Sequence, residues 1–166
     1  MVKYFEYLTA SATGTKSLGN SLVKKIAKKK GLRALVLGLR GDLGGGKTTF
    51  LQGLAKGLGI KQKVLSPTFV IMKKYNLDSR EWKVESSKRK STLHCPHSVL
   101  YHIDCYRIQR PKEILDLGFK EIISNPKNII AIEWAERIKK ILPKDTVWIN
   151  FEFIDKNKRQ IRISKF

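Results

Sequence analysis

A glycine-rich segment, GDLGGGKTTF at residues 41–50, is the part of the sequence with the clearest chemistry. Its four glycines would each weaken a regular helix or strand by about 1 kcal/mol relative to alanine, so the segment must need what glycine alone permits. The spacing fits G-x-x-x-x-G-K-[ST], a loop whose backbone N–H groups point inward and hold the α and β phosphates of a nucleotide. We therefore predict a nucleotide-binding site formed by Gly41, Asp42, Leu43, Gly44, Gly45, Gly46, Lys47, Thr48 and Thr49.

Two side chains at the end of this loop have separate expected roles. Lys47 is expected to reach the β and γ phosphates, and Thr48 to offer its hydroxyl to Mg²⁺. The helix that starts here would direct its positive N-terminal end toward the anion. An apolar run at 35–39 predicts a buried strand before the loop, and apolar residues at helical spacing follow it up to Leu58. This order of strand, loop and helix favours a phosphate-binding loop over a simple glycine-rich turn.

Phosphoryl transfer also requires an acid that binds the metal and a group that orients the nucleophile. Glu133 ends the apolar run 129–132, where a strand-end acid is expected to reach Mg²⁺ directly or through water. Asp104, in the sequence His102-Ile103-Asp104, is expected to orient an attacking water or to hold a metal-bound one. The sequence does not separate these two roles, and either acid could be an ordinary strand-end carboxylate. The predicted catalytic residues are Lys47, Asp104 and Glu133.

All histidines and cysteines of the chain fall within twelve positions, which raises the possibility of a zinc site. Their spacing matches no familiar zinc-binding pattern, and His102 and Cys105 should project from opposite faces of a strand. We expect free thiols instead of a disulfide, because a protein that uses nucleotides works in a reducing compartment. The set is His94, Cys95, His97, His102 and Cys105.

A length of 166 residues and a mass of 19.0 kDa favour a single domain over residues 1–166. No apolar run approaches the roughly 20 residues needed to span a bilayer, and the first residues lack the apolar core of a secretory signal. We therefore expect a cytoplasmic protein with no membrane partner. The formal charge of +20 favours a polyanionic partner, of which RNA is the natural candidate, although basic residues spread over the surface would also explain it.

Apolar periodicity predicts alternating strands and helices, which is typical of an α/β protein. A composition shift marks residues 76–98 as a basic insertion, expected to be an exposed hairpin tip or a mobile loop. The predicted fold is a three-layer P-loop NTPase-like fold with a mainly parallel central sheet and an antiparallel C-terminal hairpin, with the loop, Asp104 and Glu133 at the carboxyl ends of the strands. Strands are expected at 3–8, 35–39, 64–75, 99–108, 128–134, 146–154 and 159–165, and helices at 18–31, 50–58, 111–118 and 137–142.

Five short segments are distributed along the sequence: GDLGGGKTTF, SPTF, HIDCYR, LGF and IEWAER. They occur in the order found in the TsaE family, which this sequence resembles over nearly its whole length. The resemblance implies an ATPase that supports transfer of a threonylcarbamoyl group to the adenosine beside the anticodon of ANN-decoding tRNAs. It implies ATP and Mg²⁺ as cofactors, and the family's threonylcarbamoyltransferase and its companion subunit as partners, with tRNA close to the complex. The family's ATPase does not itself perform the transfer.

The same resemblance implies roles for individual residues. Thr48 and Glu133 would hold Mg²⁺, Asp104 would assist hydrolysis, and Thr68 of SPTF would be a switch residue that senses the γ-phosphate. Trp134 follows the acid, as in the family's IEW, and would be a second switch residue. Ser11 and Thr15 correspond to a segment near the adenine, and Arg159 to a basic position near the C-terminus. The stretch 79–92 is longer than the family's usual connection and either touches tRNA or has no role.

Three other functions are alternatives to this one. A P-loop kinase of a nucleoside or other small acceptor would use Arg80 and Arg89 as lid arginines. A GTP-dependent switch is disfavoured because the Asn-Lys-x-Asp pattern is absent, the nearest match being residues 125–128. A basic RNA-binding module would keep its affinity in a Lys47→Ala variant, whereas an ATPase or kinase would lose nucleotide function. No DNA partner is expected. No obvious arginine finger sits beside the loop, so we expect slow hydrolysis without partners.

Overall fold

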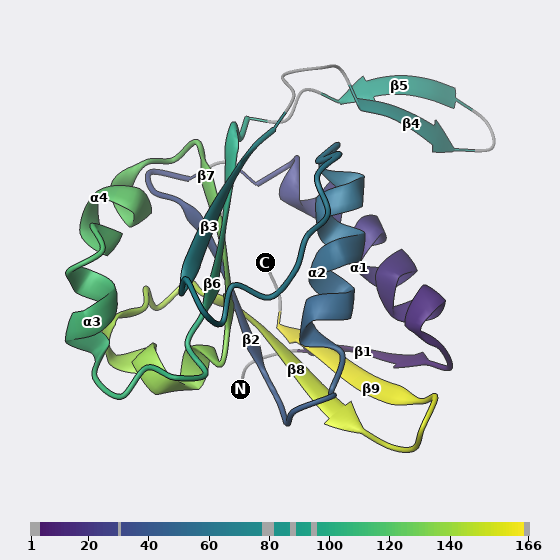
Figure 1. Cartoon of the computed structure of the whole chain (residues 1–166). Coiled ribbons are helices and arrows are strands. Elements are labelled where there is room, and N and C mark those ends of the chain that lie inside the picture. Colours follow the sequence, from purple (N-terminus) through teal and green to yellow (C-terminus); the bar gives the residue numbers. More distant parts are fainter. Residues whose placement is uncertain (1–3, 30, 78–81, 87–88, 94–95, 165–166) are drawn as a thin grey trace.

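A seven-stranded sheet forms the centre of the protein (Figure 1). The computed structural model describes residues 4–29, 31–77, 82–86, 89–93 and 96–164. In the order in which they lie across the sheet, the strands are β1 (Tyr4–Thr9), β9 (Arg159–Ser164), β8 (Val147–Phe153), β2 (Leu35–Arg40), β7 (Asn128–Glu133), β6 (Val99–Asp104) and β3 (Met72–Asn76).

The four central strands β8, β2, β7 and β6 run parallel to one another, and antiparallel pairs lie on both sides of them. All six residues of β7 are buried, as are the first five of β2, because helices cover both faces of a parallel sheet. The predicted α/β fold with a parallel centre and an antiparallel C-terminal hairpin is confirmed. The structure adds antiparallel edges formed by β3 and β1.

Helices cover the sheet on both faces and complete three layers. Figure 1 shows α1 (Ala12–Ile26) and α2 (Lys47–Gly57) on one face, and α3 (Pro111–Leu115) and α4 (Phe119–Ser124) on the other. The 3₁₀ helix η1 (Ala135–Ile141) packs on the second face, since its Ile138 belongs to the same apolar cluster as Val36 and Ile130. None of the helices in the described part of the chain is long and apolar enough to cross a membrane.

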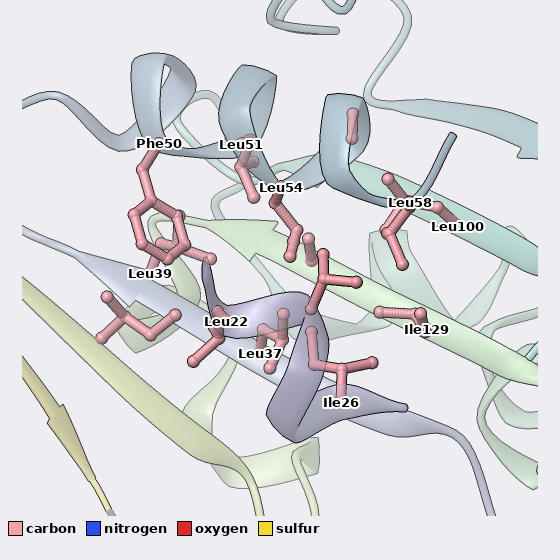
Figure 2. Close-up of a cluster of buried hydrophobic side chains, with 14 of the residues drawn as sticks. Leu22, Ile26, Leu37, Leu39, Phe50, Leu51, Leu54, Leu58, Leu100 and Ile129 are labelled. Atoms are coloured by element: carbon pink, nitrogen blue, oxygen red, sulfur yellow. The ribbon is translucent and has the colours of Figure 1, made fainter. Parts of the chain in front are cut away.

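The larger apolar cluster lies between the sheet and the helices α1 and α2 (Figure 2). Leu37 and Leu39 of β2 face this cluster, and Val36 faces the opposite one, as expected from the alternation of side chains along a strand. The two helices approach at backbone distance, because a β-carbon added to Gly53 would lie 1.9 Å from the carbonyl oxygen of Lys16. This close approach fixes α2, whose first residue is Lys47.

Several element boundaries differ from the sequence predictions. Helix α1 starts at Ala12 and ends at Ile26, before Gly31, because the lysine-rich residues that follow Ala27 have no apolar side chain to bury. The expected helix at 111–118 is followed by a second one, and Gly118 separates them with a left-handed backbone (φ 78°). The insertion forms a hairpin of β4 (Trp82–Ser86) and β5 (Arg89–Leu93), one of the two forms expected for it.

Candidate functional site

The predicted functional residues meet at one edge of the sheet, where strands β2, β6 and β7 end. The glycine-rich loop follows Arg40, the last residue of β2. Asp104 and Glu133 are the last residues of β6 and β7 and are paired across these neighbouring strands. Carboxyl ends of parallel strands are the usual position of ligand sites in such sheets. The structure therefore brings together the loop and both acids, as the sequence predicted.

The loop has a backbone that favours glycine at three positions. Gly41, Gly44 and Gly46 have φ angles of 137°, 74° and 99°, a region that L side chains rarely adopt. A β-carbon at Gly41 would also lie 2.2 Å from the carbonyl oxygen of Phe151. Helix α2 begins directly after Gly46, which has no side chain to cap it. Its first N–H groups therefore remain available to an anion.

Lys47 is buried against its own loop, with 5% of its surface exposed. Its ammonium donates hydrogen bonds to the carbonyl oxygens of Gly41 and Asp42, at 2.6 Å and 2.9 Å. The ring of Trp134 lies 4.0 Å from the same Nζ atom. Burial lowers the pKa of Lys47, and the nearby carboxylate of Glu133 opposes this shift. The cation is thus held over the loop by groups that a more strongly charged ligand could replace.

Trp134 has an unusual backbone, with a φ of 58° in the left-handed region. This conformation is costly for a bulky residue and therefore points to a function. It occurs at the junction between β7 and η1, directly after Glu133. The Trp134 ring lies over Lys47 and 5.2 Å from the ring of Tyr106. The predicted switch residue is therefore in direct contact with the lysine of the loop.

Thr48, Glu133 and His102 form a buried hydrogen-bonded group. The hydroxyl of Thr48 donates to both carboxylate oxygens of Glu133, at 2.9 Å and 3.0 Å. The Nε2 atom of His102 lies 2.8 Å from Oε1 of Glu133 and must be its donor, because a carboxylate only accepts. Hydroxyl and carboxylate oxygens are the ligands that Mg²⁺ prefers. The predicted metal pair, Thr48 and Glu133, is therefore chemically suited to this ion.

Asp104 accepts hydrogen bonds from the segment that carries Thr68. Its Oδ2 atom accepts from the hydroxyls of Thr68, at 2.6 Å, and of Ser66. Its Oδ1 atom accepts from the backbone N–H of Tyr106 at 2.9 Å. Asp104 therefore connects the end of β6 to the predicted switch residue Thr68, whereas Glu133 connects the end of β7 to helix α2.

The three more distant predicted residues do not line the cleft, and two of them, Thr15 and Arg159, lie beside the loop. The hydroxyl of Ser11 caps helix α1 by accepting from the N–H of Gly14 at 3.0 Å. Thr15 is buried, and its methyl group would lie 3.6 Å from a β-carbon placed on Gly46. Arg159 donates from Nη2 to the carbonyl oxygen of Gly44 at 3.1 Å. Thr15 and Arg159 thus support the loop from the two ends of the chain.

A cleft of about 430 Å³ adjoins the loop and both acids. Its lining includes four residues that the site prediction left out: Ser66, Phe69, Tyr106 and Arg107. Phe69 is 86% exposed, and the guanidinium of Arg107 stacks on its ring at 4.6 Å. Tyr106 and Arg107 belong to the HIDCYR segment, but nothing in the sequence indicated that Arg107 would face the loop.

The three possible zinc ligands that the structure describes, His97, His102 and Cys105, do not form a metal site. His102 contacts Glu133, and His97 lines a different cavity with Ala34 and Val36. Cys105 is a free, buried thiol whose pKa is raised to about 12, first by burial and second by the charge of Asp104. Within the described residues, no three His, Cys, Asp or Glu side chains are grouped to hold a metal ion. His94 and Cys95 lie outside the described residues.

Comparisons with known proteins identify the family of the chain. The family model "Threonylcarbamoyl adenosine biosynthesis protein TsaE" matches residues 9–161. The tRNA threonylcarbamoyladenosine biosynthesis protein TsaE of Rickettsia typhi is 36% identical over 128 residues, which cover 76% of this chain and 75% of the relative. The protein of the same description from Nostoc sp. is 37% identical over 134 residues, 79% of this chain and 70% of the relative.

A solved structure extends the similarity to the fold. The "Crystal structure of Bacillus subtilus YdiB" superposes with a TM-score of 0.70 at 30% sequence identity, and the match covers 99% of this chain and 86% of that one. The resemblance inferred from the five short segments is confirmed by these matches. The chain belongs to the TsaE family of tRNA threonylcarbamoyladenosine biosynthesis proteins.

Proposed function

We propose that the protein is a Mg²⁺-dependent ATPase that supports threonylcarbamoyl modification of the adenosine next to the anticodon in tRNA. One observation carries the proposal: the glycine-rich loop with Lys47, the Thr48–Glu133 pair and the Thr68–Asp104 pair meet at one edge of the sheet. Family membership supplies the biosynthetic context, and the residues supply the phosphate chemistry.

Glu133 and Asp104 are proposed to have different roles in hydrolysis. Glu133 is the better candidate for Mg²⁺, because it shares its carboxylate with the hydroxyl of Thr48, the other oxygen ligand expected there. Asp104 is the better candidate for orienting water, because it lies in the same cleft and accepts from the hydroxyl of Thr68. A change at Asp104 would therefore be transmitted to the segment that carries Thr68. His102 is a positioning residue that orients Glu133.

The loop residues 41–49 are proposed to hold the triphosphate of ATP. Mg²⁺ and the triphosphate supply a metal-bridged, reactive phosphoryl group when bound. The ammonium of Lys47 would exchange its two carbonyl partners for phosphate oxygens, which carry more negative charge. Arg159 is proposed to act on the nucleotide by fixing the loop, since it donates to the carbonyl oxygen of Gly44. Ser11 and Thr15 are proposed to shape the segment near the adenine, since their hydrogen bonds order the start of α1.

We expect slow hydrolysis by the isolated protein. Arg107 lines the cleft but is stacked on the exposed ring of Phe69, so a partner that reorders this pair would change the charge beside the phosphates. The proposed partners are the family's threonylcarbamoyltransferase and its companion subunit, with tRNA close by. The kinase alternative depends on lid arginines in the insertion; Arg80 lies outside the described residues, and Arg89 is the first residue of β5.

Reconstitution tests this proposal. Formation of threonylcarbamoyladenosine on tRNA would be measured by nucleoside mass spectrometry with the partner proteins and ATP, together with phosphate release. Lys47→Ala should abolish multiple-turnover modification and ATP hydrolysis, because the cation that neutralises the phosphates is lost. Lys139→Ala is a matched control at an exposed position of η1 and should behave as the wild type. Modification that is indifferent to the protein would contradict the proposal and favour the kinase, to be followed by a screen of phosphate acceptors.

A further inference from the structure

A groove with a volume of about 810 Å³ lies along the contact between α1 and α2. We call it the α1–α2 groove. Its lining includes the lysines Lys16, Lys56, Lys61 and Lys63, together with hydroxyl and amide side chains. Among the described residues, no aspartate, glutamate or aromatic residue lines it. The groove shares no residue with the cleft beside the phosphate loop, so it is a separate surface.

The walls of this groove are held in place by hydrogen bonds. One wall is α1, which packs on α2 at backbone distance beside Gly53. The other wall is residues 59–64, which fold back after α2. The N–H of Ile60 donates to the carbonyl oxygen of Ala55 at 3.0 Å, and the amide of Gln52 donates to that of Val64 at 3.1 Å. A ligand would therefore meet a preformed surface and would lose little free energy in ordering it.

The helices beside the groove carry positive charge without opposing acids. Asp42 is the single acidic residue between Tyr7 and Leu77, a range that carries fourteen lysines and arginines. Both α1 and α2 come from this range and contain no acid. The helices of the opposite face carry Glu113, Glu121 and Glu136 among their basic residues, so part of their charge cancels. The α1–α2 side is therefore the more attractive one for a polyanion.

The residues that line the groove favour nucleic acid over protein as its ligand. Protein interfaces are enriched in aromatic residues and depleted in lysine, which is the reverse of this groove. Contacts to phosphate and sugar are made by lysines and by serine, threonine, asparagine and glutamine side chains, and the groove presents Ser17, Asn20 and Gln52 between its lysines. We propose that the α1–α2 groove binds the phosphodiester backbone of tRNA. This rests on the proposed function only for the identity of the RNA.

The test compares two variants that lose the same charge. The groove variant replaces Lys16, Lys56 and Lys63 with glutamine, and the control variant replaces Lys120, Lys139 and Lys140 of α4 and η1 with glutamine. All six side chains are exposed, so both variants should unfold at the wild-type temperature by circular dichroism. Binding of fluorescein-labelled, unmodified tRNA to the full chain would be measured by anisotropy between 50 and 200 mM salt, without ATP.

The groove variant should bind tRNA at least tenfold more weakly, and the slope of log K against log salt should fall by about 2, since each lost phosphate contact contributes roughly 0.7 to 0.9. The control variant should stay within about twofold of the wild type. Equal weakening by both variants would overturn the proposal, because it would mean that tRNA responds to net charge alone. Unchanged tRNA binding with weakened binding to the transferase subunits would overturn it in favour of an acidic protein partner.

Failure of the ATPase proposal would be distinguishable from failure of this one. ATP hydrolysis without tRNA should be unchanged in the groove variant, because its three lysines lie outside the phosphate cleft. Conversely, Lys47→Ala should keep its affinity for tRNA while it loses hydrolysis. Loss of tRNA binding in Lys47→Ala, with binding retained in the groove variant, would move the RNA site to the nucleotide cleft and overturn the inference.

Discussion

Replacing Gly53 with alanine should destabilise the fold, although alanine is the better helix former. A β-carbon at this position would lie 1.9 Å from the carbonyl oxygen of Lys16 and 2.6 Å from its carbonyl carbon. These are backbone atoms, so no rotamer change can relieve the contact. Helices α1 and α2 must separate by roughly 1.5 Å to restore an ordinary contact distance, which loosens the apolar cluster between them.

The magnitude follows from two opposing terms. Overpacking a core costs about 1 to 3 kcal/mol, and a backbone overlap belongs at the upper end of that range. The gain in helix propensity from glycine to alanine is about 1 kcal/mol. We therefore expect a net loss of about 2 kcal/mol and, for a domain of this size, a melting temperature lower by roughly 4 to 8 °C. Since α2 begins with Lys47 and Thr48, its displacement should also weaken ATP binding.

Urea denaturation and calorimetry of Gly53→Ala would measure this effect, with Gly14→Ala as the control. Gly14 lies in α1, where an added β-carbon would meet its nearest neighbour at an ordinary 3.5 Å. That substitution should be neutral or stabilising. A Gly53→Ala variant as stable as the wild type would refute the inference that these helices pack at backbone distance.

Three further predictions concern a thiol, a helix cap and the metal pair. Above pH 9 the thiol of Cys105 ionises in the unfolded state but stays protonated in the folded state, where its pKa is about 12. The free energy of unfolding should therefore fall as the pH rises through this window, by about 1.4 kcal/mol per pH unit. Urea denaturation at several pH values should show a weaker pH dependence of stability in Cys105→Ala. Ser11→Ala should cost about 1 kcal/mol because it removes the N-cap of α1, whereas Ser17→Ala, in mid-helix, should cost nothing measurable; an equal effect of the two would contradict the capping role. Glu133→Gln should leave the affinity for ATP without Mg²⁺ within about threefold of the wild type, since the amide oxygen still accepts a hydrogen bond from Thr48. The increase in ATP affinity that Mg²⁺ gives should be abolished, because the negative charge is lost. Calorimetric titration with and without MgCl₂ checks this, and an unchanged effect of Mg²⁺ would exclude Glu133 as a ligand.

Local spacing made part of the site predictable. The loop from Gly41 to Thr48 is recognisable because its function depends on consecutive backbone groups, which a continuous segment supplies. Asp104 and Glu133 were predictable because each ends an apolar strand, and neighbouring parallel strands end at the same edge. The family resemblance directed attention to Thr68 and Arg159, whose contacts with Asp104 and Gly44 span 36 and 115 positions of the chain.

Other features depend on tertiary packing and have no local signal. The left-handed backbone of Trp134 is unusual for an aromatic residue, so no propensity would indicate it. The stacking of Arg107 on Phe69 joins two segments that are far apart in sequence. The α1–α2 groove is lined by side chains from two helices and from residues 59–64, so no single stretch of sequence indicated it.

The pairing of β1 with β9 has a consequence for synthesis of the protein on the ribosome. Strand β1 is synthesised first, but it can pair with its neighbour β9 only after residues 159–164 have left the ribosome. The hydrogen bond from Arg159 to the carbonyl oxygen of Gly44 can form only at the same stage. A nascent chain therefore carries its phosphate loop for most of translation before the support for that loop exists. Closure of the sheet edge is a late, long-range step, and nucleotide should bind tightly only to chains whose last strand has joined.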